Sequence, residues 1–251
     1  YNAIIHIAGD CNMPGLAITS DGSDGNQTFN DLSATDHTIT VGNETHHDSG
    51  GSVSLRMAGA GFGSGTDTAY NALAIYFDGT ADYLTAPNHS DWDFGGGDGT
   101  IELWFYPTST GGTQRLISSQ VATTLWILWW DRENNKITWK TDTASGSVEK
   151  DTVSSYTLNT WIHAALVKKG NVVKLYANGK EEIVWDDAAQ LWGDTAGVLA
   201  IGVYSADNSE PYTGYMDNIR ITKGYARYTE DFSQQLPIIA RAITNNRAGE
   251  F

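Results

Sequence analysis

Cysteine is almost missing from this sequence, which contains Cys11 and no other cysteine. A single cysteine excludes an internal disulfide, a CxxC redox pair and a cysteine-based zinc cluster. Basic residues are scarce as well, because 15 lysines and arginines stand against 30 acidic residues and leave a formal net charge of -15. Nucleic acid and anionic membranes both attract positive surfaces, so we expect neither as a partner. Uninterrupted apolar runs stay well short of the roughly 18 residues that a membrane-spanning helix needs.

Glutamate is the scarcer of the two acids, with 9 residues against 21 aspartates. Glutamate favours helices, whereas aspartate favours turns and caps. The 27 glycines point in the same direction as the aspartates. The composition therefore favours a chain of short strands and many loops, with few helices.

Strand patterns recur along the chain, each bounded by Gly, Asp, Asn or Pro, and almost no helical period appears. We predict that residues 74–77 pair with 83–86 across an Asp-Gly turn. We also predict that residues 115–120 pair with 124–130, and that a strand at 136–140 follows them.

A three-stranded meander is predicted at residues 160–168, 172–177 and 181–185. Its second turn contains Asn178-Gly179, a strong hairpin signal. The remaining strands are expected at 199–204 and 215–222, and one short helix is expected at 186–192.

About a dozen short strands at this spacing predict an all-β fold, a two-sheet antiparallel β-sandwich or jelly roll. The predicted sandwich takes up residues 16–236, between an N-terminal arm at 1–15 and a C-terminal tail at 237–251. The tail contains a short apolar run with no partner inside the sandwich. We therefore expect it to dock on a neighbouring chain.

Several motifs carry a family likeness in the right order. They are Tyr76 to Pro87 (YFDGTADYLTAP), Trp92 to Phe94, Thr100 to Phe105, Trp161 to Ala165, Lys174 to Gly179, Leu199 to Gly202 and Gly214 to Ile221. Together they resemble the concanavalin A-like lectin/glucanase domains of the laminin-G or pentraxin-like type, which implies a concanavalin A-like jelly roll. This fold supports enzymes, lectins and scaffolds alike, so it does not by itself give the function.

A narrower resemblance appears at both ends of the same region. Residues 223–232 are similar to the end of the version of this domain found in bacteriophage virion proteins, and residues 21–25, 29–31 and 37–40 are similar to its first strands. This resemblance implies a protein that is displayed on a virion surface.

Glycan cleavage would need two carboxylates at a defined separation. The glucanases of this family carry alternating carboxylates of the Glu-x-Asp-x-x-Glu kind, and no such run is present. Glu102 stands alone on its strand, with Trp104 and Tyr106 at the positions where further acids would be needed. We therefore predict a protein without glycosidase activity and assign no catalytic residue.

Calcium is the cofactor that the resemblance implies, with Asp78 and Asp217 as candidate ligands. Hard oxygen ligands are what calcium prefers in proteins. The alternative interpretation is that Asp78 caps a turn and Asp217 bonds backbone at a strand bend.

The histidines show no HExxH or other spacing typical of catalytic zinc. Adjacent residues on an extended chain point in opposite directions, so His46 and His47 are expected to be solvated loop residues. His163 shares a face with Trp161, Ala165 and Val167, and we interpret it as a structural imidazole at the edge of the core.

Strand alternation places Trp126, Leu128 and Trp130 on one face of their strand and Leu125, Ile127 and Trp129 on the other. For each ring, the core or a subunit interface is favoured over a sugar-stacking role. Glycan contacts are expected in loops instead, where sandwiches tend to carry their binding residues. The candidate residues are Asp131, Asn134, Asn135, Asp207, Asn208 and Tyr212.

These observations favour a non-enzymatic surface protein of a phage virion, either a capsid decoration or a fibre component. Its expected partners are other virion proteins, copies of itself and host cell-surface glycans. One alternative is a secreted bacterial carbohydrate-binding or adhesion module, located outside the cell or on its surface. The second alternative is a glycan-cleaving enzyme of the same fold.

Overall fold

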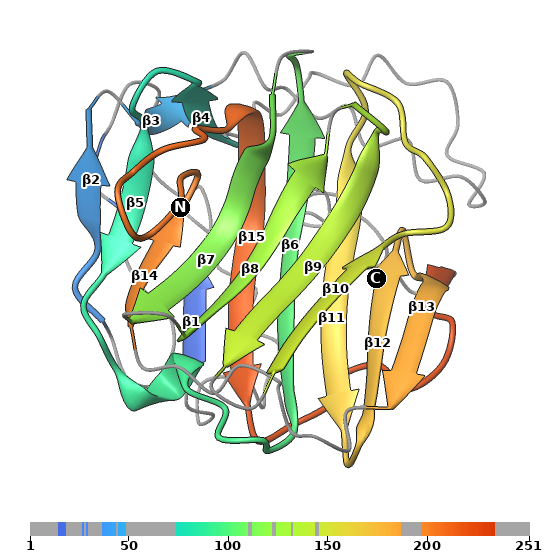
Figure 1. The fold of residues 1–251 in the computed structure, drawn as a ribbon. Coiled ribbons are helices and arrows are strands. Elements are labelled where there is room, and N and C mark those ends of the chain that lie inside the picture. Colours follow the sequence, from blue (N-terminus) through green and yellow to red (C-terminus); the bar gives the residue numbers. More distant parts are fainter. Residues whose placement is uncertain are drawn as a thin grey trace, which may run out of the picture.

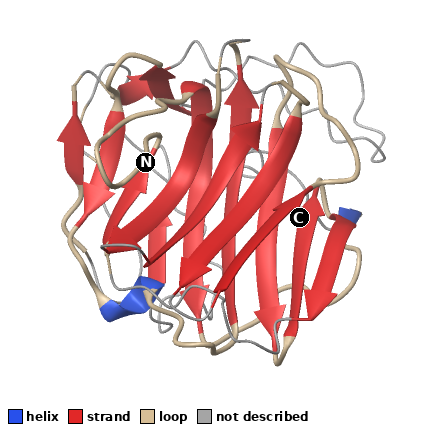
Figure 2. Cartoon of the chain, in the orientation of Figure 1, coloured by secondary structure: helices blue, strands red, loops and turns tan. Residues whose placement is uncertain are grey.

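The computed structural model describes residues 15–18, 27, 29, 37–43, 45–48, 74–109, 112–121, 124–131, 133–143, 146–186 and 197–233. These residues form two antiparallel β-sheets that pack face to face, so the predicted all-β sandwich is confirmed (Figure 1). Figure 2 shows that strands make up almost all of the regular structure. No helix in the described part of the chain is long and apolar enough to cross a membrane.

The larger sheet has eight strands. Their order is β13 (Lys180–Asp186), β12 (Val172–Ala177), β11 (Ile162–Lys169), β6 (Gly99–Pro107), β15 (Thr213–Lys223), β4 (Ala74–Asp78) and β3 (His46–Asp48), and β1 (Gly15–Ile18) pairs with the far end of β15.

The smaller sheet has seven strands. Their order is β10 (Gly146–Asp151), β9 (Lys136–Thr143), β8 (Thr124–Asp131), β7 (Gln114–Val121), β14 (Val198–Ile201), β5 (Tyr83–Ala86) and β2 (Thr40–Gly42). Between β5 and β6 lies the 3-10 helix η2 (Ser90–Trp92).

Local pairing was predicted well where a short turn joins neighbours. The β7–β8–β9 series and the β11–β12–β13 meander are both confirmed by their registers. Strand β10 was not predicted, because its sequence GSVEKD is polar and almost wholly exposed. The predicted helix at 186–192 lies outside the described residues except for Asp186, which ends β13, and so do the arm and the tail apart from Gly15.

The predicted pairing of residues 74–77 with 83–86 is wrong. β4 pairs with β15 in the larger sheet, whereas β5 pairs with β14 in the smaller one. The Asp78-Gly79 turn therefore carries the chain from one sheet to the other. Both strands bury alternate residues in the same core from opposite sides, since Phe77 and Leu84 are both fully buried. A hairpin and a crossing between sheets share the same local turn signal, so the sequence does not distinguish them.

The core lies between the sheets and is rich in aromatic rings. Trp126, Leu128 and Trp130 of β8 point into it, and Leu125, Ile127 and Trp129 point away, as alternation predicted. Each fully buried ring of this kind stabilises the fold by about 2 to 3 kcal/mol relative to exposure.

Two indole nitrogens in the core donate to backbone carbonyls. Trp92 donates through its indole nitrogen to the Gly197 carbonyl at 2.7 Å, and Trp126 donates to the Trp92 carbonyl at 3.1 Å. Both bonds tie η2 to the smaller sheet, because Gly197 directly precedes β14 and Trp126 belongs to β8.

Residues 224–233 cross the outer face of the larger sheet after β15 ends. The Phe232 amide donates to the Gly179 carbonyl at 2.7 Å, in the β12–β13 turn. The Phe232 ring stacks on Tyr228, with centroids 3.7 Å apart, and packs with Ala165 and Tyr176. The outer face of the larger sheet is therefore partly covered by the chain itself.

Gly179 provides a test of how firmly this segment is held. Its φ is +73°, and an added Cβ would lie 2.5 Å from the Ser233 amide nitrogen. Gly170 has a similar φ of +59°, but nothing lies within 4 Å of its added Cβ. We expect Gly170→Ala to lower the free energy of unfolding by about 1 kcal/mol through backbone strain alone. Gly179→Ala should lower it by about 3 kcal/mol, because the overlap adds to that strain.

Urea unfolding of the two variants side by side measures the difference. Equal losses for both would contradict firm packing of residues 232 and 233 against the turn.

Candidate functional site

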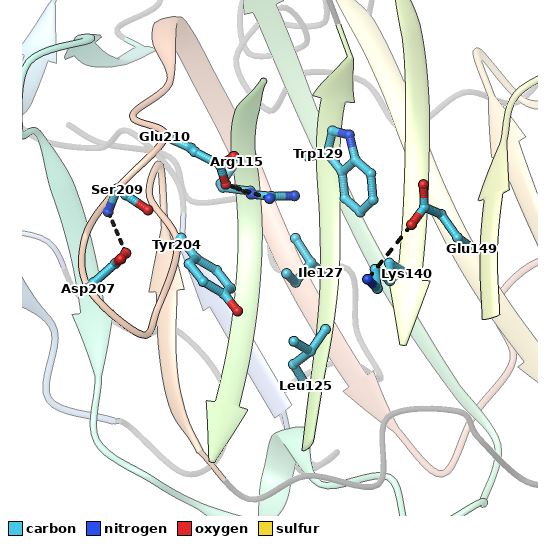
Figure 3. A pocket seen from close by; sticks show the side chains of 10 residues that line it. All are labelled: Arg115, Leu125, Ile127, Trp129, Lys140, Glu149, Tyr204, Asp207, Ser209 and Glu210. Atoms are coloured by element: carbon cyan, nitrogen blue, oxygen red, sulfur yellow. Dashed lines mark hydrogen bonds and ion pairs between the residues drawn. The ribbon is translucent and has the colours of Figure 1, made fainter. Parts of the chain in front are cut away.

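A groove of about 430 Å³ lies on the outer face of the smaller sheet (Figure 3). Three strands form its floor, and the turn before β15 forms one wall. The lining residues are Arg115, Leu125, Ile127, Trp129, Lys140, Glu149, Tyr204, Asp207, Ser209 and Glu210.

The floor of the groove follows from the alternation of β8. Because Trp126, Leu128 and Trp130 fill the core, Leu125, Ile127 and Trp129 must face outward. Arg115 of β7 lies directly opposite Trp129 in the register. Its guanidinium carbon is 4.7 Å from the centroid of Trp129 and 5.4 Å from that of Tyr204. The cation therefore joins the two rings through cation-π contacts.

The wall of the groove is a closed turn. The Tyr204 amide donates to the Ser209 carbonyl, and the Asn208 amide donates to the Tyr204 carbonyl, both at 2.9 Å. Arg115 forms an ion pair with Glu210, and its own amide donates to the Glu210 carbonyl at 3.0 Å. These bonds fix the turn to β7, so that Tyr204 is held in place beside the sheet.

Charged groups surround the two rings. Lys140 lies 3.2 Å from an Asp142 carboxylate oxygen and 3.8 Å from one of Glu149. Asp207 is exposed, and its carboxylate accepts a bond from the Ser209 amide at 3.0 Å. Hydrogen bonding by Ser209 lowers the pKa of Asp207. The groove thus offers the partly exposed ring of Tyr204 beside Trp129, which is 8% exposed beneath Arg115. Acidic side chains and an ammonium donor surround them, a combination that suits a ligand with both C–H faces and hydroxyl groups.

Among the predicted glycan-contacting residues, Asp207 is the one that lines this groove. Asn208 is exposed in the same turn but is not part of the lining. Asp131, Asn134 and Asn135 belong to the separate turn between β8 and β9. There the Asp131 carboxylate accepts bonds from the Glu133 amide at 3.1 Å and from the Asn134 side chain at 2.8 Å.

Tyr212 was expected in a solvent-facing loop, and that placement is wrong. Its side chain is fully buried, its hydroxyl donates to the Tyr215 carbonyl at 3.2 Å, and its ring lies 5.8 Å from that of Phe77. Burial raises the pKa of this phenol well above its ordinary value. The polar residues just before Tyr212 suggested a loop, but the chain turns inward there to begin β15.

Most of the groove was not predicted as a site. Arg115, Lys140, Glu149 and Tyr204 were not among the candidates, although the outward face of β8 was recognised and contacts were expected in the loop at 205–212. Pairing Arg115 with Glu210 joins positions 95 residues apart. The two residues meet only because of how the strands and the 204–210 turn are arranged in the fold. No local sequence pattern predicts that contact.

The two candidate calcium ligands do not come together. Asp78 lies opposite Thr213, and Asp217 lies opposite Trp104, four residues further along β15. At about 3.3 Å per residue, this places them roughly 13 Å apart along the strand. Asp78 accepts a bond from the Thr80 amide at 2.7 Å, which agrees with the turn-cap interpretation.

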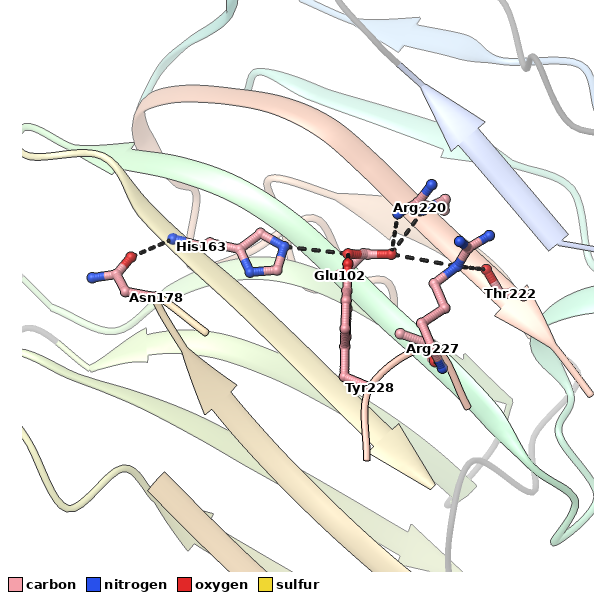
Figure 4. A network of polar contacts seen from close by, with 8 residues as sticks. Glu102, His163, Asn178, Arg220, Thr222, Arg227 and Tyr228 are labelled. Carbon is pink, nitrogen blue, oxygen red and sulfur yellow. Dashed lines mark hydrogen bonds and ion pairs between the residues drawn. The ribbon is translucent and has the colours of Figure 1, made fainter. Parts of the chain in front are cut away.

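Glu102 lies on the opposite outer face of the sandwich, beneath residues 224–233 (Figure 4). One carboxylate oxygen is bonded by Arg220 and lies 3.5 Å from Arg227; the other accepts from Tyr228 at 2.8 Å and lies 3.3 Å from Nε2 of His163. His163 is buried, which confirms its structural interpretation.

The electrostatics of Glu102 are opposite to those of a catalytic acid. Burial alone would raise its pKa, but the hydrogen bond from His163 and the charges of Arg220 and Arg227 outweigh it and lower the pKa to about 2. A proton donor for glycan cleavage needs a raised pKa and an accessible substrate. Glu102 instead holds the closing segment to the sheet.

The family described as the concanavalin A-like lectin/glucanases superfamily matches residues 78–228, and no curated protein sequence matches the chain. Domain 4 of AbnA, an extracellular GH43 arabinanase from Geobacillus stearothermophilus solved with arabinotriose, has a TM-score of 0.60 at 16% identity. That likeness covers 92% of this chain and 100% of the domain.

Two toxin binding domains share the fold as well. For Paraclostridial Mosquitocidal Protein 1 the TM-score is 0.61 at 14% identity, over 83% of this chain and 48% of that one. For botulinum neurotoxin DC in complex with SialylT it is 0.60 at 9% identity, over 88% and 50%. The chain therefore spans about half the length of these toxin domains, and at these identities the likeness shows the fold alone.

Glu102 should make the stability of the protein depend on acid pH. Its folded pKa of about 2 lies below the ordinary value of 4.5. Its contribution to the free energy of unfolding, about 3 kcal/mol, is therefore present above pH 4.5 and is lost as the pH falls toward 2. We expect Glu102→Gln to cost about this amount at pH 7, and the gap from the parent protein to shrink between pH 5 and pH 2.

Urea unfolding across that pH range measures the effect, with Glu133→Gln as an exposed control that should change stability by less than about 0.5 kcal/mol. A gap between Glu102→Gln and the parent that does not vary with pH would contradict the assignment.

Proposed function

Because the chain belongs to the concanavalin A-like lectin/glucanase superfamily, we propose that it is a non-enzymatic, lectin-like module that binds a glycan in the groove between Trp129 and Tyr204. The observation that carries the proposal is the groove itself. Two aromatic side chains are held by one arginine on the open face of a sheet, and carboxylates and a lysine surround them.

The chemistry of these groups matches a carbohydrate. The C–H faces of a sugar ring pack on aromatic side chains, and its hydroxyl groups bond to carboxylates, ammonium groups and backbone. Tyr204 and the edge of Trp129 supply the first kind of contact, and Asp207, Glu149 and Lys140 supply the second. Because Arg115 and the 204–210 turn already fix the wall, little side-chain entropy has to be lost when a ligand binds.

Solved relatives support the same ligand class. The arabinanase domain was determined with arabinotriose, and the neurotoxin binding domain was determined with SialylT. Arabino-oligosaccharides and sialylated oligosaccharides are therefore the first ligands to test.

Binding without cleavage is the reading that the groove favours. Glu210 is tied to Arg115, and hydrogen bonding lowers the pKa of Asp207. The environment of Asp207 therefore opposes the protonated carboxyl group that cleavage of a glycosidic bond requires.

Display on a virion surface, as a capsid decoration or fibre component, is the finer part of the proposal. It is supported by the resemblance of residues 223–232 and of the first strands to domains of phage virion proteins. Many copies on one particle would turn weak single contacts into strong attachment to a cell surface. Other virion proteins or copies of this chain would then be its partners.

Replacement of one ring in the groove tests glycan binding. The chain is first screened on an array that includes arabino-oligosaccharides and sialylated glycans, and one ligand is then titrated by calorimetry. Tyr204→Ala should raise the Kd at least tenfold, a loss of about 1.4 kcal/mol. Tyr225→Ala is the matched control, because Tyr225 is half exposed and lies outside the groove, and it should leave the Kd unchanged.

Binding to no glycan on the array, or an unchanged Kd for Tyr204→Ala, would contradict the proposal. Release of reducing ends from a bound polysaccharide would replace it with the enzyme alternative. A calcium cofactor is a separate proposal, and it would need ligands other than Asp78 and Asp217 together. Added calcium should raise the melting temperature of the protein, and a chelator should reverse the rise.

Mass spectrometry of purified phage particles tests the virion role. The chain should be present in the particle in many copies, whereas a secreted bacterial module would be found in culture medium and absent from particles.

A further inference from the structure

Two histidines and one aspartate meet at the edge of the sandwich, on the side of η2 and away from the groove. Each of His37, His89 and Asp91 offers one ligand atom, and these atoms lie within 4.8 Å of one another. Nε2 of His37 is 3.4 Å from one oxygen of Asp91, and Nδ1 of His89 is 3.3 Å from the other. We propose that these three side chains form a zinc-binding site.

The distances suit a tetrahedral ion. Zinc binds imidazole nitrogen and carboxylate oxygen at about 2.0 to 2.2 Å, so neighbouring ligands of a tetrahedron are roughly 3.3 to 3.5 Å apart. Each imidazole lies at this spacing from Asp91, but from a different carboxylate oxygen. Rotation of the carboxylate and a shift of the imidazoles are needed to bring the three ligand atoms, which lie within 4.8 Å of one another, around one ion.

Backbone structure holds two of the three ligands in place. His89 caps η2, and its Nδ1 accepts a bond from the Asp91 amide at 3.2 Å. An imidazole acceptor nitrogen has one lone pair, so an ion bound at Nδ1 would take the place of the Asp91 amide. The next residue, Trp92, is fully buried and bonded to the Gly197 carbonyl.

The Asp91 carboxylate is buried, unlike most acidic side chains on a protein surface. The side chains of His37 and Asp91 are 5% and 7% exposed, whereas that of His89 is 41% exposed. The cluster is thus closed on the protein side and open on one side, where an ion and a water as fourth ligand can enter. Three protein ligands and one water are typical of an open zinc site.

Zinc fits this ligand set better than calcium or magnesium does. Those ions prefer six or more oxygen ligands, whereas two imidazoles and one carboxylate favour a transition metal. The site is therefore separate from the calcium prediction and from the proposed glycan groove.

Zinc at this position would link the segment just before β2 to the β5–β6 connection. Residues 37 and 89 are far apart in sequence, and an ion bound only in the folded state stabilises that state. With zinc at one hundred times its Kd, the melting temperature should rise by about 5 to 10 °C.

Calorimetric titration of the metal-free full chain with zinc tests the proposal. One zinc should bind per chain, with a melting-temperature rise that a chelator reverses and that calcium or magnesium does not reproduce. His89→Asn removes an imidazole but keeps an acceptor that can cap η2. It should weaken zinc binding at least tenfold and remove the stabilisation, as should Asp91→Asn.

Two controls keep the result specific. Asp93→Asn replaces a carboxylate two residues away, and a His46→Ala/His47→Ala variant removes the other neighbouring histidines of the sequence. Both should bind zinc as the parent protein does. Circular dichroism confirms that each variant is folded before titration. Unchanged zinc affinity in folded His89→Asn, or no zinc binding by the parent protein, would overturn the proposal.

Discussion

Successive side chains of a strand point to opposite faces, and this single constraint connects the core of the sandwich with both of its outer surfaces. Once Trp126, Leu128 and Trp130 fill the core, Trp129 has to face outward. In the same way, Ile101, Leu103 and Phe105 face inward and leave Glu102 on the outside of the larger sheet. The candidate groove and the buried acid are therefore consequences of how the core is packed.

The outer face of the larger sheet is partly covered by the chain, whereas that of the smaller sheet carries a groove. On the larger sheet, residues 224–233 cover Glu102, and the charges of Arg220 and Arg227 compensate for its burial. On the smaller sheet, the 204–210 turn reaches only the margin of the face and leaves Trp129 and Tyr204 beside an open groove. One face contributes to stability, and the other is available for a ligand.

Features that depend on local periodicity were predictable from the sequence. The all-β class, the β7–β8–β9 series, the β11–β12–β13 meander and the two faces of β8 all rest on alternation and on turn residues such as Asn178-Gly179. The sequence did not predict that β4 and β5 belong to different sheets. A tight turn between two sheets can contain the same residues as the turn of a hairpin. The burial of Tyr212 was also not predicted, because the polar residues just before it indicated a loop.

Sites built from residues far apart in the sequence could not be predicted, for a different reason. Arg115 meets Glu210, and His37 meets Asp91, only after sheet register and loop paths are fixed. Neither pair has a sequence spacing that is typical of a known motif. By contrast, setting Glu102 aside as a catalytic acid rested on a local property, the absence of neighbouring carboxylates on its strand.

Strand β10 is the last strand of the smaller sheet in the described part of the chain, and its side chains include Glu149, Lys150 and Asp151. A free strand edge offers unpaired backbone groups to any other strand, and charged side chains along it oppose such pairing. Concentrated solutions of this acidic protein should therefore resist aggregation through that edge. Chains that come close together can therefore keep their smaller sheets separate at that edge.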